Sequence, residues 1–351
     1  MNTKLMMLSL LLFNLPTYAV FDLTQINTYQ GQVITPASLT ALSQHNLPDE
    51  VKQKTEEWLN KNPEIVQKVI QQNYEIKSLE DFKRIYEENK RLLEQNNITF
   101  IPSNNHILDN VIPGYVIKIS PLHLRVNNIL VGVNRSPDDQ LPRLFDKISE
   151  ETTVKKIAKL NALLPMINTY QTASRAATAL RLEEYAENNP HITPIPTHVI
   201  TIPGCPADAA DKHCIVLEQK MTTVRQLGTL KDPTDYFTPE GLIALLQAIQ
   251  YAGVWNLTSS NIFINDNDQF LLPDGEYPDN TNPSTFFHND KDKFLWNIGC
   301  GFEQLWHQFP HNSKQREIIK EFVISDKNLQ QSRKFPELIR LVAPHFLPSL
   351  A

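Results

Sequence analysis

The most informative segment of this chain is Gly253-Val-Trp-Asn-Leu-Thr-Ser-Ser-Asn-Ile-Phe-Ile264, which precedes the acidic turn Asp274-Gly-Glu276. Its pattern predicts a helix end, a tight polar loop, and two short apolar strands joined by a turn. Asn261 opens the first strand and Asp274 follows the second. Their oxygen atoms suit magnesium, so Asn261, Asp274 and Glu276 are candidate metal ligands. Turn formation by Asn261 and Asp274, with Glu276 as an exposed carboxylate, is the alternative interpretation.

The first 19 residues predict a secretory signal peptide. One positive charge at Lys4 precedes an apolar run from Leu5 to Leu15, and small residues lead up to a cleavage site after Ala19. A buried N-terminal helix is the alternative. Elsewhere no segment reaches the roughly 20 apolar residues of a transmembrane helix. We therefore expect an exported protein, periplasmic or secreted, that has no membrane attachment after cleavage.

The composition is that of a globular protein, with 41% hydrophobic and 21% charged residues. A net charge of -6 argues against nucleic acid as a partner, because such binding needs clustered basic surface. The chain has only 10 glycines but 24 prolines, so its loops are stiff. This matters because loops that bind phosphate usually need glycine.

The three cysteines give no metal pattern. Cys205 and Cys214 flank a polar loop between two apolar segments, so a disulfide and two unpaired thiols both remain open for this pair. Zinc is disfavoured, because only His213 adds a ligand and the spacing matches no zinc site. Cys300 lies in an apolar helical pattern and is expected to be a core residue.

The periodicity predicts an α+β chain. Residues 20–97 form a helical prefix, because apolar residues recur at helical spacing over 49–96. Strand patterns and one long helix follow over 98–221, and residues 222–351 are mostly helical with one small hairpin. The strands are expected at 98–101, 115–119, 198–202 and 214–218, and the helices at 172–187, 239–252, 293–308, 314–323 and 335–342.

The order of these segments resembles the protein-kinase-like fold over residues 98–310. Tyr115-Val-Ile-Lys118 resembles the strand whose lysine contacts the α and β phosphates of ATP. The helix with Glu183 and Glu184 resembles the one whose glutamate pairs with that lysine. Ile215-Val-Leu-Glu-Gln-Lys-Met221, which contains Glu218, resembles the strand that enters the hinge between two lobes, and Trp296-Asn-Ile-Gly-Cys300 resembles part of a later helix.

The resemblance implies a bilobal kinase-like fold with an N-lobe at 98–221 and a C-lobe at 222–351. It implies ATP and magnesium as cofactors, with Lys118, Glu183, Glu184 and Glu218 in the nucleotide site. Asn261, Asp274 and Glu276 would hold the metal. From the residues alone, Lys118 also fits a surface lysine on an edge strand, because lysine is seldom buried.

The sequence departs from the kinase pattern at two places. Asn256 stands where a kinase has its catalytic Asp, and an amide cannot accept the proton of a hydroxyl group, so its expected role is limited to orienting an acceptor. The segment Ile101-Pro-Ser-Asn-Asn-His-Ile-Leu108 has no glycine where kinases have a glycine-rich loop.

Three functions remain open at this stage. The first is an exported pseudokinase that binds nucleotide with weak or lost phosphotransfer. The second is an active atypical kinase, and the third is a secreted interaction protein that binds a protein partner on the same scaffold.

Overall fold

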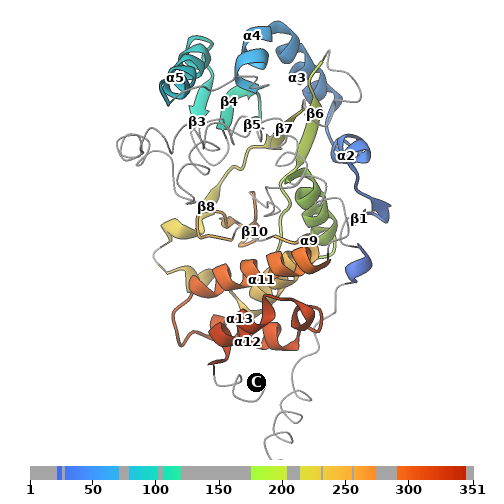
Figure 1. The fold of residues 1–351 in the computed structure, drawn as a ribbon, viewed down its shortest axis with the longest axis vertical. Coiled ribbons are helices and arrows are strands. Elements are labelled where there is room, and N and C mark those ends of the chain that lie inside the picture. Colours follow the sequence, from blue (N-terminus) through green and yellow to red (C-terminus); the bar gives the residue numbers. More distant parts are fainter. Residues whose placement is uncertain are drawn as a thin grey trace, which may run out of the picture.

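The computed structural model is a mixed α+β structure (Figure 1). It describes residues 22–25, 28–70, 79–101, 106–119, 175–203, 214–230, 232–254, 257–273 and 291–344. The predicted signal peptide and Cys205, one of the two cysteines whose pairing stayed open, therefore lie outside the described residues. Within the described part, no helix is both long and apolar enough to cross a membrane.

The prefix contains more than the expected helices. A 3-10 turn, η1 (Leu23–Gln25), precedes a two-stranded hairpin of β1 (Thr28–Tyr29) and β2 (Gln32–Val33). In the described part of residues 36–95, four α-helices follow, and the third of them continues into a π-helical turn, η2. They are α2 (Pro36–Ser43), α3 (Asp49–Lys61), α4 (Pro63–Ile65) with η2 (Val66–Ile70), and α5 (Leu79–Gln95). Helix α4 begins at Pro63, directly after Asn62 in the N-cap position.

A five-stranded antiparallel sheet forms the middle of the upper half in Figure 1. Its order is β3-β4-β5-β7-β6. The strands are β3 (Thr99–Ile101), β4 (His106–Ile112), β5 (Tyr115–Ile119), β6 (Thr197–Thr201) and β7 (Cys214–Gln219). A turn at Pro113 and Gly114 joins β4 to β5, and Gly114 has a φ of +77°.

The two faces of this sheet have different partners. Residues of α3, α4, η2 and α5 pack with one face in a single apolar cluster, which includes Ile117 of β5 and Leu217 of β7. Ile117 and Leu217 are register partners, so their side chains share a face. Side chains alternate along a strand, so the neighbouring residues of β5 and β7 point to the other face. The prefix helices thus cover the apolar face of the sheet.

The second half combines a small sheet with a helical layer. Its strands are β8 (Val224–Gln226), β9 (Phe263–Asn265) and β10 (Phe270–Leu271), in the order β10-β9-β8, with η4 (Leu227–Thr229) and η5 (Pro233–Tyr236) beside them. The helices are α9 (Pro239–Ala252), α11 (Lys291–His307), α12 (Lys314–Ser325) and α13 (Phe335–Val342), with η6 (Leu329–Gln331) before the last. All four helices were expected from the sequence.

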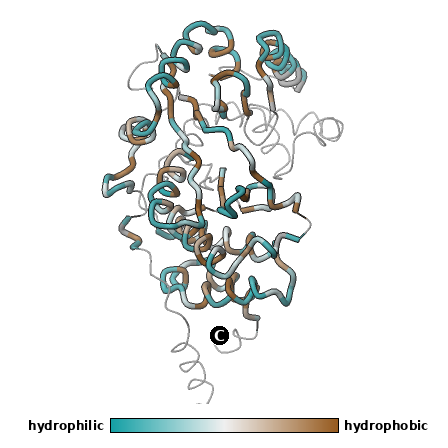
Figure 2. Tube along the Cα trace, turned by 180° about the vertical axis from the view of Figure 1, so that it is seen from behind, coloured by the Kyte–Doolittle hydropathy of each residue, from teal (hydrophilic) through white to brown (hydrophobic). Residues whose placement is uncertain are grey.

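Among the described residues, two separate apolar cores underlie this arrangement. One joins the prefix helices to the five-stranded sheet, and the other fills the helical half. Figure 2 shows hydrophilic residues along the prefix helices at the top and hydrophobic stretches within both halves. Tyr29, Ile34 and Leu39 belong to the second core although they come from the prefix. The predicted boundary at residue 97 is therefore not a boundary between cores.

Helix α9 begins and ends where the sequence predicts. Thr238 caps its N-terminus, because its side chain accepts a hydrogen bond from the Gly241 amide. Gly253 ends it in a left-handed conformation with a φ of +70°, and its amide donates to the Ile249 carbonyl. A β-carbon on Gly253 would lie 2.5 Å from the Phe294 ring of α11. The polar loop after α9 thus starts at a closely packed point.

We expect Gly253→Ala to lower the free energy of unfolding more than Gly114→Ala does. Both positions need a positive φ, which costs an L-residue about 1–2 kcal/mol. Only Gly253 adds a steric clash, which costs about 1–3 kcal/mol more, whereas a β-carbon on Gly114 meets nothing within 4 Å. Urea unfolding of both variants measures the difference. If both variants lose the same free energy of unfolding, the Phe294 ring moves away from the new β-carbon without measurable cost.

Candidate functional site

A buried ion pair lies in the centre of the five-stranded sheet. Lys118 Nζ of β5 lies 2.7 Å from Glu218 Oε1 of β7, and the two side chains are only 5% and 4% exposed. Strand β5 lies between β4 and β7, so Lys118 is not a surface lysine of an edge strand. A charged group is buried at high cost unless it is paired, so each residue explains the burial of the other.

The register explains why these two charges meet. Lys118 pairs with Val216 and Glu218 pairs with Thr197, so all four side chains point to the same face of the sheet. This face is opposite to the one that α3, α4, η2 and α5 cover. Glu218 lies diagonally across from Lys118, which is within reach of two long side chains. The position of the pair therefore follows from strand alternation.

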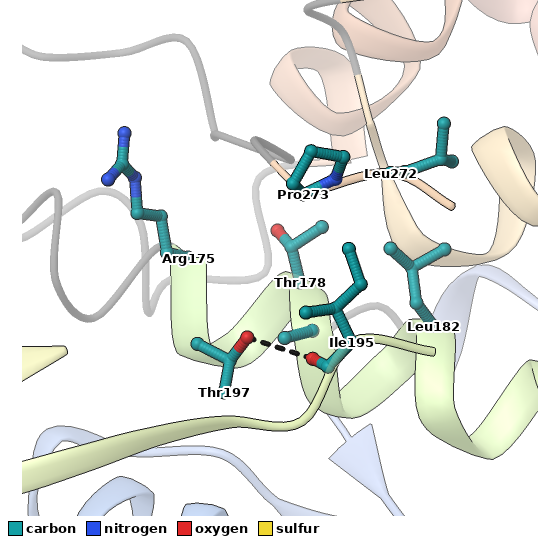
Figure 3. Close-up of a pocket in the computed structure, with 8 residues that line it drawn as sticks. Arg175, Thr178, Leu182, Ile195, Thr197, Leu272 and Pro273 are labelled. Atoms are coloured by element: carbon teal, nitrogen blue, oxygen red, sulfur yellow. Dashed lines mark hydrogen bonds between the residues drawn. The ribbon is translucent and has the colours of Figure 1, made fainter. Parts of the chain in front are cut away.

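The helix over residues 175–186 closes this face on one side. Its residues Arg175, Thr178 and Leu182 line a narrow cavity of about 10 Å³, roughly the space of one water molecule. Figure 3 shows the opposite walls, which are Ile195 and Thr197 from the segment entering β6 and Leu272 and Pro273 after β10. The Thr197 hydroxyl donates to the Ile195 carbonyl at 2.9 Å. Because Thr197 is the register partner of Glu218, one wall of the cavity lies on the same face of the sheet as the ion pair.

Arg175 is a second buried cation at this cavity. The residue is 5% exposed, and Figure 3 shows its side chain at the start of the helix, apart from the other labelled side chains. Neither Arg175 nor Thr197 was among the residues singled out from the sequence. The available signal for Arg175 was its place as the first charged residue of the alanine-rich helical pattern over residues 172–187.

Glu183 and Glu184 point to other partners, which corrects the predicted pairing with Lys118. Asn46 donates to Glu183 Oε1 at 2.8 Å, and His45 lies 3.3 Å from the same oxygen. The Gln30 amide donates to Glu184 Oε1 at 3.0 Å. The helix turns residues 175, 178 and 182 towards the sheet, and positions 183 and 184 lie about 100° and 200° further round. The counterion of Lys118 is therefore Glu218.

The loop between α9 and β9 is anchored on two sides. Gln304 of α11 accepts a hydrogen bond from the Leu257 amide at 2.6 Å. The Ser259 carbonyl accepts from the Gly228 amide, and the Ser260 carbonyl accepts from the Gln226 side chain. The loop is thus tied both to the helical layer and to the strand β8. Asn256 itself lies outside the described residues.

Asn261 lies at the end of this loop, half-buried. Its backbone amide donates a hydrogen bond to the Thr258 carbonyl at 2.8 Å. This bond closes a turn of the loop before β9. Phe263 pairs with Leu271, and continuing that register by two residues puts Asn261 opposite Pro273. Asp274 and Glu276 lie outside the described residues. In the part that the structure describes, no group of three or more His, Cys, Asp or Glu residues is placed to hold a metal ion.

Comparison of the chain with known protein families, with curated proteins and with solved structures finds no match.

We expect Lys118 and Glu218 to be strongly coupled in stability. Lys118→Met leaves a buried carboxylate without its counterion and should lower the free energy of unfolding by about 3–5 kcal/mol. Lys118→Met/Glu218→Leu removes both charges and should recover most of that loss. Urea unfolding of the two single variants and the double variant measures the coupling.

The exposed pair of Lys54 and Glu50 on α3 is the matched control, with a separation of 2.5 Å and side chains 49% and 76% exposed. Lys54→Met should change stability by less than about 1 kcal/mol, because water screens the pair. If the losses at Lys118 and Glu218 simply add, the two residues do not stabilise each other.

Proposed function

We propose that this is an exported protein with a bilobal kinase-like fold that binds ATP with magnesium and has weak or lost phosphotransfer. Lys118 would contact the nucleotide phosphates beside Glu218. Asn261 and Asp274 would bind magnesium, with Glu276 as a further carboxylate at the same turn. Asn256 would at most orient an acceptor, because its amide cannot take up a proton.

The main support for this proposal is the buried position of Lys118. In protein kinases the ATP-contacting lysine lies on the third strand, and the helix with its partner glutamate follows. Lys118 lies on β5, which is the third strand of the five-stranded sheet in chain order. The helix over residues 175–186 follows β5 and packs beside the same face. A lysine that is 5% exposed in such a place is hard to explain by surface solubility alone.

One observation favours the second candidate, a secreted interaction protein without nucleotide. Glu218 already supplies a counterion for Lys118, while Glu183 and Glu184 are engaged with residues of the prefix. Such a counterion compensates the cost of burying the lysine charge, so the folded protein needs no ligand at this place. The test must therefore ask first whether nucleotide binds.

We expect ATP with magnesium to raise the melting temperature of the mature protein. A ligand at 100 times its Kd stabilises the folded state by about 2.7 kcal/mol. Asp274→Ala should remove the part of the shift that requires magnesium, which an EDTA series measures. Lys118→Met/Glu218→Leu should lose the whole shift, and it keeps the sheet free of an unpaired charge. No shift of the wild type at saturating ATP would favour the interaction protein.

Labelled ATP distinguishes a pseudokinase from an active atypical kinase. We expect no transfer of label to the protein or to added substrates, because a positioned base is worth about 10²–10⁴-fold in rate. Asn256→Asp restores a carboxylate at that position and is the matched variant. Transfer by the wild type at the rate of Asn256→Asp would contradict the loss of phosphotransfer and favour an active kinase.

A further inference from the structure

The N-terminal part of the prefix lies against the helix over residues 175–186. We define the N-terminal clasp as residues 22–25 and 28–47, which contain η1, the β1–β2 hairpin and α2. Its Tyr29, Ile34 and Leu39 are buried in the core of the helical half, together with Leu180 and Leu182 of that helix. The clasp is therefore part of the folded body, although it precedes the sheet in sequence.

Arg181 ties three segments together. Its guanidinium group donates to the carbonyls of Gln25 and Thr28 in the clasp and to that of Tyr251 in α9. It also lies 4.7 Å from the centre of the Tyr251 ring. The Arg181 side chain is only 3% exposed. Because guanidinium has five donors in a fixed plane, no other side chain can make this set of bonds.

The clasp also holds the glutamates of the helix. Glu183 contacts His45 and Asn46, and the Gln30 amide binds Glu184. The Tyr29 hydroxyl lies 2.9 Å from His45 Nε2 within the same group. Burial, followed by the charges of nearby glutamates including Glu183, raises the pKa of Tyr29 to about 12. Tyr29 thus remains a neutral hydroxyl group beside these carboxylates at physiological pH.

A third set of contacts joins the clasp to β6 of the sheet. The Ser43 hydroxyl accepts from the Val199 amide at 2.9 Å, and the Ser43 carbonyl lies 2.5 Å from His198 Nδ1. Gln44 donates to the Val199 carbonyl at 2.5 Å. These bonds satisfy the outer edge of β6, which is the last strand of the sheet. The clasp therefore contacts the helix, the sheet and α9 at once.

We propose that the N-terminal clasp positions the helix over residues 175–186 beside the Lys118–Glu218 pair, and that Arg181 is the positioning residue that anchors it. The clasp faces Glu183 and Glu184, so the helix presents its Arg175, Thr178 and Leu182 side to Thr197 and the ion pair. With the clasp in place, both glutamates are turned away from Lys118. The clasp thereby sets which side chains of the helix line the proposed nucleotide site.

Hydrogen–deuterium exchange of the mature protein tests the positioning without any ligand. Arg181→Met keeps an unbranched apolar stem and removes the guanidinium donors. Amides of residues 28–47 and 175–186 should exchange about tenfold faster, because bonds to a charged group are lost and the segments open locally. Amides of β5 and β7 should keep their wild-type rates.

Arg316→Met is the matched control, because Arg316 is also a buried arginine but lies in α12 over the Trp306 ring. It should leave the exchange of 28–47 and 175–186 unchanged. His45→Ala/Asn46→Ala removes the contacts to Glu183 at a more exposed place, so it serves if Arg181→Met does not fold. It should accelerate the same two segments by a smaller factor. Unchanged exchange at 175–186, or an equal increase throughout the chain, would overturn the proposal.

A second measurement rests on the proposed function. ATP with magnesium should bind Arg181→Met at least several-fold more weakly than Arg316→Met, and titration by fluorescence or calorimetry gives both values. Equal affinities would contradict a positioning role at the site. If the wild type binds no ATP, the nucleotide proposal fails, and the exchange experiment still decides whether the clasp positions the helix.

Discussion

The buried pair of Lys118 and Glu218 constrains the whole five-stranded sheet. Two charges that are almost fully removed from water must stay together, because either one alone would be costly. Side chains alternate along a strand, so a shift of β5 or β7 by one residue would move its charge into the apolar face under the prefix helices. The pair therefore fixes the register, and the register fixes which face of the sheet is polar.

The clasp adds a second constraint on the same face. The helix over residues 175–186 could pack on the sheet with several of its sides, because leucine and alanine recur around it. Arg181 removes that freedom by binding carbonyls of both the clasp and α9. The clasp buries Tyr29, Ile34 and Leu39 in the helical core, while α3 to α5 belong to the core of the sheet. The prefix thereby links the two cores.

Local signals predicted the elements better than their contacts. Helix α9 begins and ends where the sequence predicts, because its capping by Thr238 and Gly253 depends only on neighbouring residues. The partner of Lys118 depends on strand order and register, which are long-range properties. Glu218, which directly follows the apolar residues Ile215-Val-Leu217, was the available signal for this partner. A carboxylate at the end of an apolar strand needs a counterion when it is buried. The clasp has little periodicity, so nothing in it predicted its contacts with Glu183 and Glu184.

The ion pair also bears on how a nucleotide would bind in the proposed site. A lysine without a counterion attracts phosphate directly, whereas Lys118 and Glu218 together carry no net charge. A phosphate beside Lys118 would meet the negative charge of Glu218 at a similar distance, and in a partly dry site that repulsion offsets much of the attraction. A divalent cation would have to supply the missing positive charge, with Arg175 as a second buried cation at the cavity on this face of the sheet. Nucleotide binding at this site would therefore depend on magnesium more strongly than in a site whose lysine is free of a buried carboxylate.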